Sequence, residues 1–345
     1  MLSDRSREYW DFFISECVRQ RAPLYVRLAE GVRDDEALSA LAANVRASQP
    51  MANLLFGAVH YLLLRGAVHP LSAHYRTLTE ESTLRSGDPF PLFRQFCFAH
   101  EAEIAALLAT RVTNTNEVAR SAYLRAGFLT IAAQEKEPLH LIELGPSAGL
   151  NLHWHRYNYR YVTETAVHEA GADDERFLIT TQIVGGRVPP LGPQPRLGLS
   201  LGLERDPVDL NDRNARDWLK ALVWPDHRDR FRRLEDALSA VGGLAVDIRA
   251  GDALGLLPEA LAECPAGGTI CVFHTMTTYQ FSKTEREALE NLLTRASVRR
   301  PLWRLSMELS DGVYPLKLDR YADGAKQTRV LGFCDPQGGC LEWRG

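Results

Sequence analysis

The chain contains 345 residues, of which 45% are hydrophobic and 24% are charged, so one large globular domain or two ordinary ones can form. A formal net charge of −4 provides no broadly basic surface, which makes nucleic acid and anionic lipid poor candidate partners. The first residues carry acids, and the most apolar window, residues 54–64, is too short to span a bilayer, so we expect a cytoplasmic protein that does not enter a membrane.

Residues 1–135 are predicted to be helical throughout. Apolar residues recur at three- and four-residue steps in the first helix, and acids or a proline open the next two; these helices are predicted over 7–20, 34–47 and 91–111. Residues 51–66 are apolar on nearly all sides, which is typical of a buried helix, and Gly66 ends it. A last helix is predicted over 115–134, with Thr115 as its N-cap.

The pattern changes after Glu137, where short apolar runs begin to alternate with helical stretches. This alternation predicts an α/β domain over 136–345, with a mostly parallel sheet covered on both faces. The runs expected to form strands are 139–144, 177–184, 196–204, 244–250, 269–275 and 302–309. Trp218 and Trp224 are expected to pack a helical stretch onto this sheet. Residues 314–343 contain no helical pattern, which predicts an antiparallel hairpin at the C-terminal edge of the sheet.

The stretch LIELGPSAGLN, residues 141–151, carries the strongest chemical signal. It predicts a strand, a glycine-rich turn and a helix, an arrangement that lets the backbone approach a ligand and aims free N–H groups at it. Glu143 at the strand end suits a ligand that carries an ammonium group or hydroxyls and repels a diphosphate, which favours S-adenosylmethionine over NAD. The alternative is a tight turn that simply needs small residues.

Two more acids follow predicted strands. Glu204 is placed to accept ribose hydroxyls and Asp252 to accept the adenine amino group, although a single acid at such a position is more often a helix cap or a solvated loop residue. Carboxyl ends of parallel strands share one edge of a sheet, so these acids are expected to converge. The predicted cofactor-binding residues are Glu143, Gly145, Ser147, Gly149, Asn151, Glu204, Asp252 and Ala253.

The same stretch, residues 141–151, also fits a different chemistry. G-x-S-x-G can form a nucleophile elbow, and Ser147, Asp252 and His274 occur in the chain order of α/β-hydrolases. The helical chain before Ser147 and the presence of Pro146 directly before it oppose this interpretation. A serine hydrolase therefore stays as an alternative.

The residues expected to face a substrate follow the later strands and open the last N-terminal helix. His274 is a candidate general base beside Tyr279, or else a hydrogen-bonded histidine at a strand end. Glu308 is expected to orient an acceptor, or to pair with an arginine. The substrate-binding candidates from the helix start are Asn116, Glu117 and Arg120, with a helix cap and a structural ion pair as the alternative. We expect no metal site. His153 and His155 lie two residues apart, so on a helix their side chains do not face each other, and no third ligand is evident.

Several stretches occur together in a recognisable order: TNTNEVARSAYL, LIELGPSAGLNLHWHRYNYRY, FHTMTTYQF and DPQGGCLEW. On these the sequence resembles an uncharacterised bacterial family with a methyltransferase-like C-terminal half. It departs from that family at His155, where an acid is common, and at Gln337, where histidine is common. The resemblance implies a Rossmann-like sheet of the SAM-methyltransferase type behind an all-helical N-terminal region. It implies no demonstrated reaction.

Taken together, the residues predict a SAM-dependent methyltransferase that acts on a small molecule. They do not predict the oligomeric state of the protein. A non-catalytic module of the same fold, binding a metabolite or a protein, is the first alternative. We expect the six cysteines to be free thiols, because none forms a C-x-x-C pair.

Overall fold

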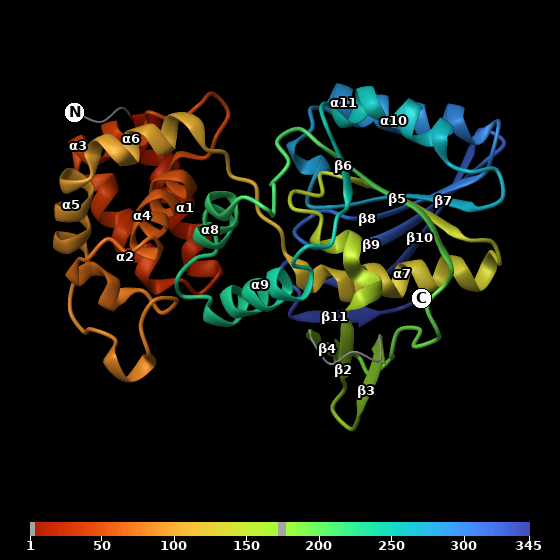
Figure 1. Cartoon of the computed structure of the whole chain (residues 1–345), viewed down its shortest axis with the longest axis horizontal. Helices are drawn as coiled ribbons and strands as arrows, with labels where there is room; N and C mark the ends of the chain where they lie inside the picture. The colour runs from red at the N-terminus through yellow and green to blue at the C-terminus, as the bar shows by residue number, and fades with distance from the viewer. Residues whose placement is uncertain (1–3, 172–176) are drawn as a thin grey trace. The chain divides into compact units, whose positions relative to one another are not determined.

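The computed structural model describes residues 4–171 and 177–345, and these form two compact units (Figure 1). One unit combines residues 1–115 with 208–235, and the other combines 116–207 with 236–345. This division differs from a single boundary at residue 135 in two ways. The second unit begins earlier, and residues 208–235 belong with the N-terminal helices.

The helical unit is built from helices that surround one apolar core. Its α-helices are α1 (Asp4–Arg19), α2 (Pro23–Asp34), α3 (Glu36–Ala42), α4 (Met51–Leu64), α5 (Phe90–Ala99), α6 (Glu101–Thr110), α8 (Arg213–Ala221) and the start of α9 (Arg228–Ala240), with short 3-10 helices η1 (Pro70–His74) and η2 (Glu81–Thr83). The helix expected over 91–111 is interrupted at His100, which ends α5 and precedes α6.

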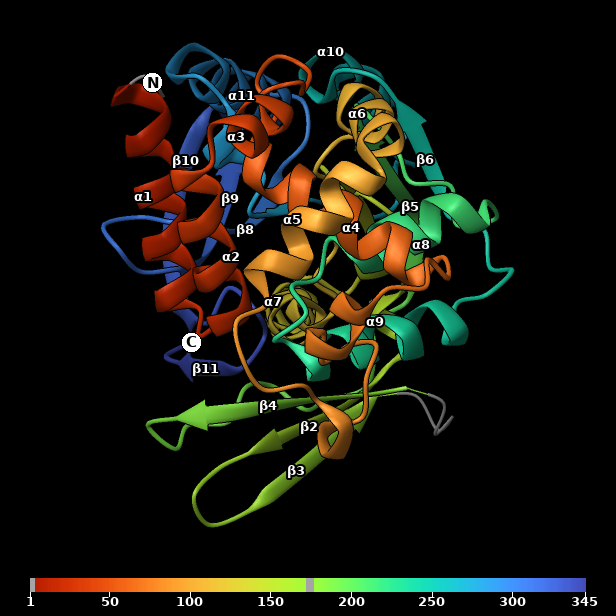
Figure 2. The same ribbon diagram turned by 90° about the vertical axis from the view of Figure 1, so that its left-hand side faces the viewer.

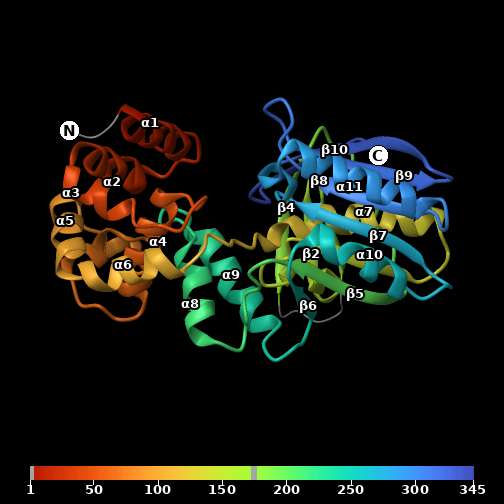
Figure 3. The same ribbon diagram turned by 90° about the horizontal axis from the view of Figure 1, so that it is seen from above.

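Aromatic side chains fill the centre of this unit. Phe56 on the buried helix α4 lies 4.7 Å from Tyr25 and 5.5 Å from Phe93 between ring centroids. Trp218 on α8 packs edge-on against Tyr61 and donates its indole N–H to the Val112 carbonyl at 3.0 Å. Trp218 and Trp224 therefore pack into the helical unit and not onto the sheet, which corrects the expectation above. Figure 3 shows α8 beside α4.

The second unit contains one sheet of eleven strands. In chain order they are β1 (Leu139–Leu144), β2 (Asn158–Val162), β3 (Val167–Gly171), β4 (Leu178–Val184), β5 (Leu197–Glu204), β6 (Asp247–Ala250), β7 (Thr269–Thr275), β8 (Leu302–Met307), β9 (Pro315–Ala322), β10 (Ala325–Cys334) and β11 (Cys340–Trp343). Their spatial order is β3-β2-β4-β11-β10-β9-β8-β7-β1-β5-β6. All six predicted strands are present, and the class is α/β with a mostly parallel sheet.

The predicted hairpin is present but does not close the sheet. β9 and β10 pair antiparallel, and the sheet continues beyond them through β11, β4, β2 and β3 (Figure 2). The sequence predicts neither β2 nor β3. In the structure β2 alternates, with Tyr159 and Tyr161 buried on one side.

Helices cover both faces of the central strands (Figure 1). The helices α10 (Ala253–Glu263) and α11 (Lys283–Ser297) pack on one face against Ile142, Leu144 and Val272. The helix α7 (Ser121–Gln134) packs on the other face. There Phe128 meets Phe273 edge-on at 5.1 Å, and a side chain at Gly127 would collide with Leu305. Alternation along each strand thus assigns successive residues to opposite layers.

Short 3-10 helices occupy the turns that matter for a site: η3 (Val118–Arg120) before α7, η4 (Leu150–Arg156) after β1 and η5 (Thr278–Gln280) after β7. The expected helix over 115–134 thus begins as an α-helix only at Ser121, and Thr115 does not cap it. The glycine-rich turn is likewise followed by a 3-10 helix in place of an α-helix.

All six cysteines are free thiols, and all but Cys340 are buried. Burial raises the pKa of Cys17 to about 12 and that of Cys264 to about 11. No helix in the described part of the chain is long and apolar enough to cross a membrane.

Candidate functional site

The turn after β1 has a left-handed backbone at three positions. Gly145, Ser147 and Gly149 have φ angles of 69°, 55° and 74°, a left-handed backbone that costs little only for glycine. The chain closes on itself through Gly149 N–H to the Pro146 carbonyl at 2.8 Å. A side chain at Gly149 would also meet Val246 at 2.8 Å. The small residues are therefore required for packing, whether or not a ligand binds.

Glu143 lies beneath this turn and is almost completely buried, at 1% exposure. Burial raises the pKa of its carboxyl to about 8. The hydrogen bond with Asn151 and the positive charge of Arg120 lower this pKa, but burial outweighs them. Its Oε2 has no hydrogen-bond partner among the described residues. Asn151 is held in turn by the Ser121 hydroxyl, which donates to its Oδ1 at 2.8 Å. At neutral pH the carboxyl is thus largely protonated.

Glu204 connects the end of β5 to the same turn. Its Oε2 accepts the Ser147 N–H at 2.8 Å, and its Oε1 accepts the Asp206 N–H at 3.2 Å. Glu143 pairs in register with Gly202, two residues before Glu204, so the two acids lie on the same face of the sheet. The structure therefore brings Glu143, Ser147 and Glu204 together.

Asp252 lies at the end of the neighbouring strand β6 but is engaged locally. It caps α10, whose first residue is Ala253, by accepting the Gly255 N–H at 2.9 Å. It also lies 3.6 Å from Arg205 in an exposed ion pair. The contacts of Asp252 therefore support the helix-cap interpretation. The Gly251 N–H donates to the Glu204 carbonyl, which keeps Glu204 and Asp252 at the same edge of the sheet.

The segment before α7 reaches this edge from the other side. Asn116 accepts the Leu150 N–H at 3.0 Å, and Glu117 accepts the Ala119 N–H at 3.2 Å as the cap of η3. Arg120 donates to the carbonyls of Pro336 and Thr275 at 2.8 and 3.3 Å. Asn116 precedes η3, so it does not share a helix face with Arg120 as expected. Both nevertheless contact the site, Asn116 at η4 and Arg120 at the end of β7.

His274 and Glu308 form a second cluster. His274 Nδ1 lies 2.7 Å from Glu308 Oε1, which also accepts the N–H groups of Thr277 and Thr278 at 2.9 and 3.1 Å. Tyr279 contributes only its backbone N–H, to Glu308 Oε2 at 3.2 Å, and its side chain is exposed. Glu308 thus pairs with a histidine and not with an arginine, and its contacts hold the loop after β7.

The two clusters lie on opposite faces of the sheet. In the β1–β7 register Glu143 is opposite Phe273, so the next residue, His274, points the other way, towards α11. Glu143, expected to hold the cofactor, and His274, expected to face the acceptor, therefore lie on opposite faces of the sheet. The sequence did not specify this, because a shift of a single residue along a strand reverses the direction of a side chain.

The proposed serine nucleophile is not assembled with a base. Ser147 Oγ and His274 Nε2 each have no hydrogen-bond partner within residues 4–171 and 177–345. Asp252 is engaged at α10, and the carboxylate that bonds His274 is Glu308. The same described residues contain no group of three or more His, Cys, Asp or Glu side chains that could hold a metal ion.

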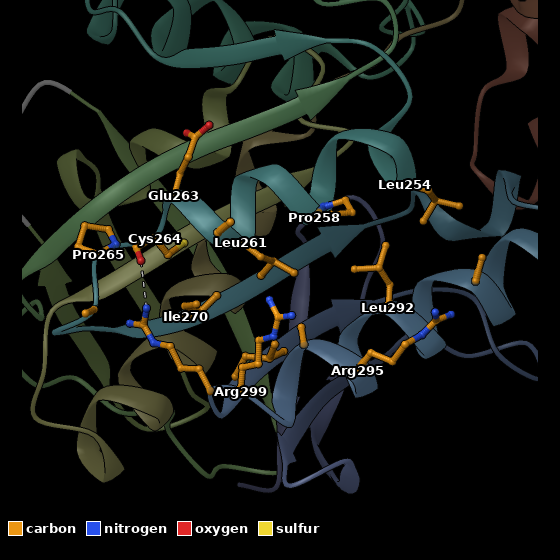
Figure 4. A pocket seen from close by; sticks show the side chains of 16 residues that line it. Leu254, Pro258, Leu261, Glu263, Cys264, Pro265, Ile270, Leu292, Arg295 and Arg299 are labelled. Carbon is orange, nitrogen blue, oxygen red and sulfur yellow. Dashed lines mark hydrogen bonds between the residues drawn. The ribbon is translucent and has the colours of Figure 1, made fainter.

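Two cavities lie on the α10–α11 face, and the sequence predicted neither. The larger, of ≈ 1240 Å³, is an open trough between α10 and α11 whose walls include Leu261, Leu292 and Arg299 (Figure 4). It reaches Ile270 and Leu302, near the amino ends of their strands, and thus lies away from the carboxyl edge. The smaller, of ≈ 280 Å³, is lined by His274 and Glu308.

Comparison with curated proteins gives no match to this chain. The family model described as "uncharacterized protein conserved in bacteria (DUF2332)" matches residues 8–343, which covers both compact units. The match extends over nearly the whole chain, and the chain therefore belongs to this bacterial family.

Proposed function

We propose that the chain is a SAM-dependent methyltransferase that acts on a small molecule, with the cofactor at the turn after β1. The order of its five mutually parallel strands supports this. Numbered by their position in the chain, β1, β5, β6, β7 and β8 lie in the order 3-2-1-4-5, which is that of a doubly wound sheet. Such sheets bind ligands where the order reverses, here between β1 and β7.

The observation that carries the proposal is the buried carboxyl beneath the turn. Glu143 has a partnerless Oε2 and a pKa of about 8, so a cation above it would be stabilised as the carboxyl loses its proton. SAM carries such charge on its ammonium and sulfonium groups. Because Glu143 is covered by the turn, it would act through its charge and not through contact. This fits a cationic guest better than a diphosphate.

The remaining groups fit the other parts of the cofactor. Glu204 would accept ribose hydroxyls with the lone pairs that its two backbone N–H bonds leave free. Asp252 would accept the adenine amino group while it caps α10. When bound, SAM would supply an activated methyl group, and the protein would contribute mainly by positioning the acceptor. Arg120 and Thr275, on the Glu143 face, would line that position.

Calorimetric titration with SAM tests the proposal. We expect saturable binding, with a proton released below pH 8, so that the measured heat depends on the ionisation enthalpy of the buffer. Glu204→Gln should weaken binding by about tenfold or more, because a charged acceptor is lost. Glu259→Gln, an exposed acid on α10, is the matched control and should bind like the original chain. Absence of heat at millimolar SAM would contradict the proposal.

A further inference from the structure

The ≈ 280 Å³ cavity beside His274 lies between α11 and the ends of β7, β8 and β9. Strand register sets its floor, because His274 pairs with Ser306 and Ser306 pairs with Lys317. These three side chains therefore stand in one row on the same face of the sheet. Leu289 and Pro315 add apolar walls.

The imidazole in this row has a fixed orientation. Burial alone would raise the pKa of Glu308, but the hydrogen bonds from His274 and the loop N–H groups outweigh it, and the pKa is lowered. The carboxylate therefore accepts, and Nδ1 of His274 must donate to it. This places the lone pair of a neutral imidazole on Nε2, an assignment from the hydrogen-bond network. His274 is 3% exposed, and its Nε2 has no partner among the described residues.

One cation on the cavity wall has no ion-pair partner among the described residues. Arg304 is matched by Asp319 and Glu290, at 2.5 and 3.1 Å, and Lys326 also pairs with Glu290 at 2.8 Å. That leaves Lys317 and Arg286 against Glu308. Lys317 forms no ion pair with any described residue, while Arg286 donates only to the carbonyls of Thr278 and Phe281. Glu285 lies near Arg286, whose charge lowers the pKa of that carboxyl, so Lys317 is the cation on the cavity wall that no described carboxylate pairs with.

We infer that this cavity binds a small monocarboxylate that also carries a hydroxyl group. The carboxylate would pair with Lys317, and charge-assisted hydrogen bonds of this kind are among the stronger ones. The hydroxyl would donate to His274 Nε2, and carbon atoms would lie against Leu289 and Pro315. A buried ring nitrogen without a partner and an unpaired cation in one cavity favour that pair of groups. The inference concerns binding on the α11 face and does not rest on the proposed SAM site.

Three probes of nearly equal size separate the contributions: lactate, propionate, which lacks the hydroxyl, and propane-1,2-diol, which lacks the charge. Binding is measured on the full-length chain by NMR, with the imidazole ¹⁵N signals of His274 as the local readout. We expect lactate to bind tightest and to shift Nε2. Equal affinity for lactate and propionate, or lactate binding without a change at Nε2, would overturn the inference.

Two matched variants test the location. Lys317→Met removes the unpaired cation and should weaken lactate by about fivefold or more. Lys283→Met removes an equal charge on α11, where Lys283 and its ion-pair partner Glu287 both lie outside the cavity lining, and should leave lactate affinity within about twofold. Equal losses in both variants would indicate nonspecific attraction of an anion and refute the site. Normal SAM titration in Lys317→Met would show that the two sites are separate.

Discussion

Glu143 is a carboxyl group that the fold keeps out of water, and this should make the protein's stability depend on pH. Its folded pKa of about 8 exceeds that of an exposed glutamate, so its contribution is complete below about pH 4.5 and is lost as pH rises through about 8. Glu143→Gln removes this titration. The stability of the variant relative to the original chain should therefore increase across that range.

The size of this effect is on the order of 5 kcal/mol at most, since the pKa shifts from 4.5 to about 8 and each unit corresponds to about 1.4 kcal/mol. Urea unfolding measured at acid, neutral and alkaline pH would detect it. Glu259→Gln on α10, where the acid is exposed, should show no such trend. If the difference in unfolding free energy between Glu143→Gln and the original chain did not change with pH, the carboxyl would have the same pKa in the folded and the unfolded chain.

At the same scale, the sequence predicted the tight turn after β1 better than it predicted the orientation of the side chains around it. Gly145 and Gly149 were expected to form a tight turn, and both have positive φ. The contact from Glu204 to the Ser147 N–H was not predictable, because it depends on the register of β5 against β1. The direction of His274 depends on one residue of register, which composition does not specify.

Among the elements, α10 offers a test that separates the two roles of Asp252. Asp252→Ala removes the N-cap and should destabilise the second unit by about 1 kcal/mol. Asp252→Asn keeps a cap of similar strength but loses the charge, so it should unfold like the original chain. Thermal unfolding compares the two. Equal destabilisation by both substitutions would show that the pair with Arg205, not the cap, holds the helix start.

Strong periodic elements were predicted and irregular ones were not. The strand β1 is confirmed, because six consecutive buried residues match a strand covered on both faces. The strand β2 was missed because its buried residues, Tyr159 and Tyr161, follow the aromatic and histidine residues of η4 without a turn signal. The 3-10 helix η4 was also missed, since its residues have no pattern that separates it from an α-helix.

At the scale of the whole molecule, the chain leaves its first compact unit, forms part of the second and returns for residues 208–235. The return is explained by packing: a side chain at Gly57 of α4 would lie 3.2 Å from Leu222 and 3.6 Å from Trp218. The sequence did not predict this, because an amphipathic helix packs equally well on a sheet or on other helices. The surface on which such a helix packs is therefore not specified by its own hydrophobic pattern.

Trp218→Ala should therefore destabilise the helical unit, by about 3 to 5 kcal/mol. Hydrogen exchange followed by mass spectrometry should show faster exchange in α4 and α6, with the strands of the second unit little changed. Trp303→Ala on β8 is the matched change, since both side chains are 5% exposed, and it should give the reverse pattern. Equal acceleration everywhere in both variants would mean that the chain opens as one cooperative body.

The buried cysteines can be used to detect which of the two compact units opens. Cys17 and Cys97 belong to one unit, and Cys264 and Cys271 to the other, and none of them meets solvent while its unit stays closed. A maleimide added while the purified protein is heated would label whichever pair had become exposed. The labelled peptides would then report which of the two units opens first.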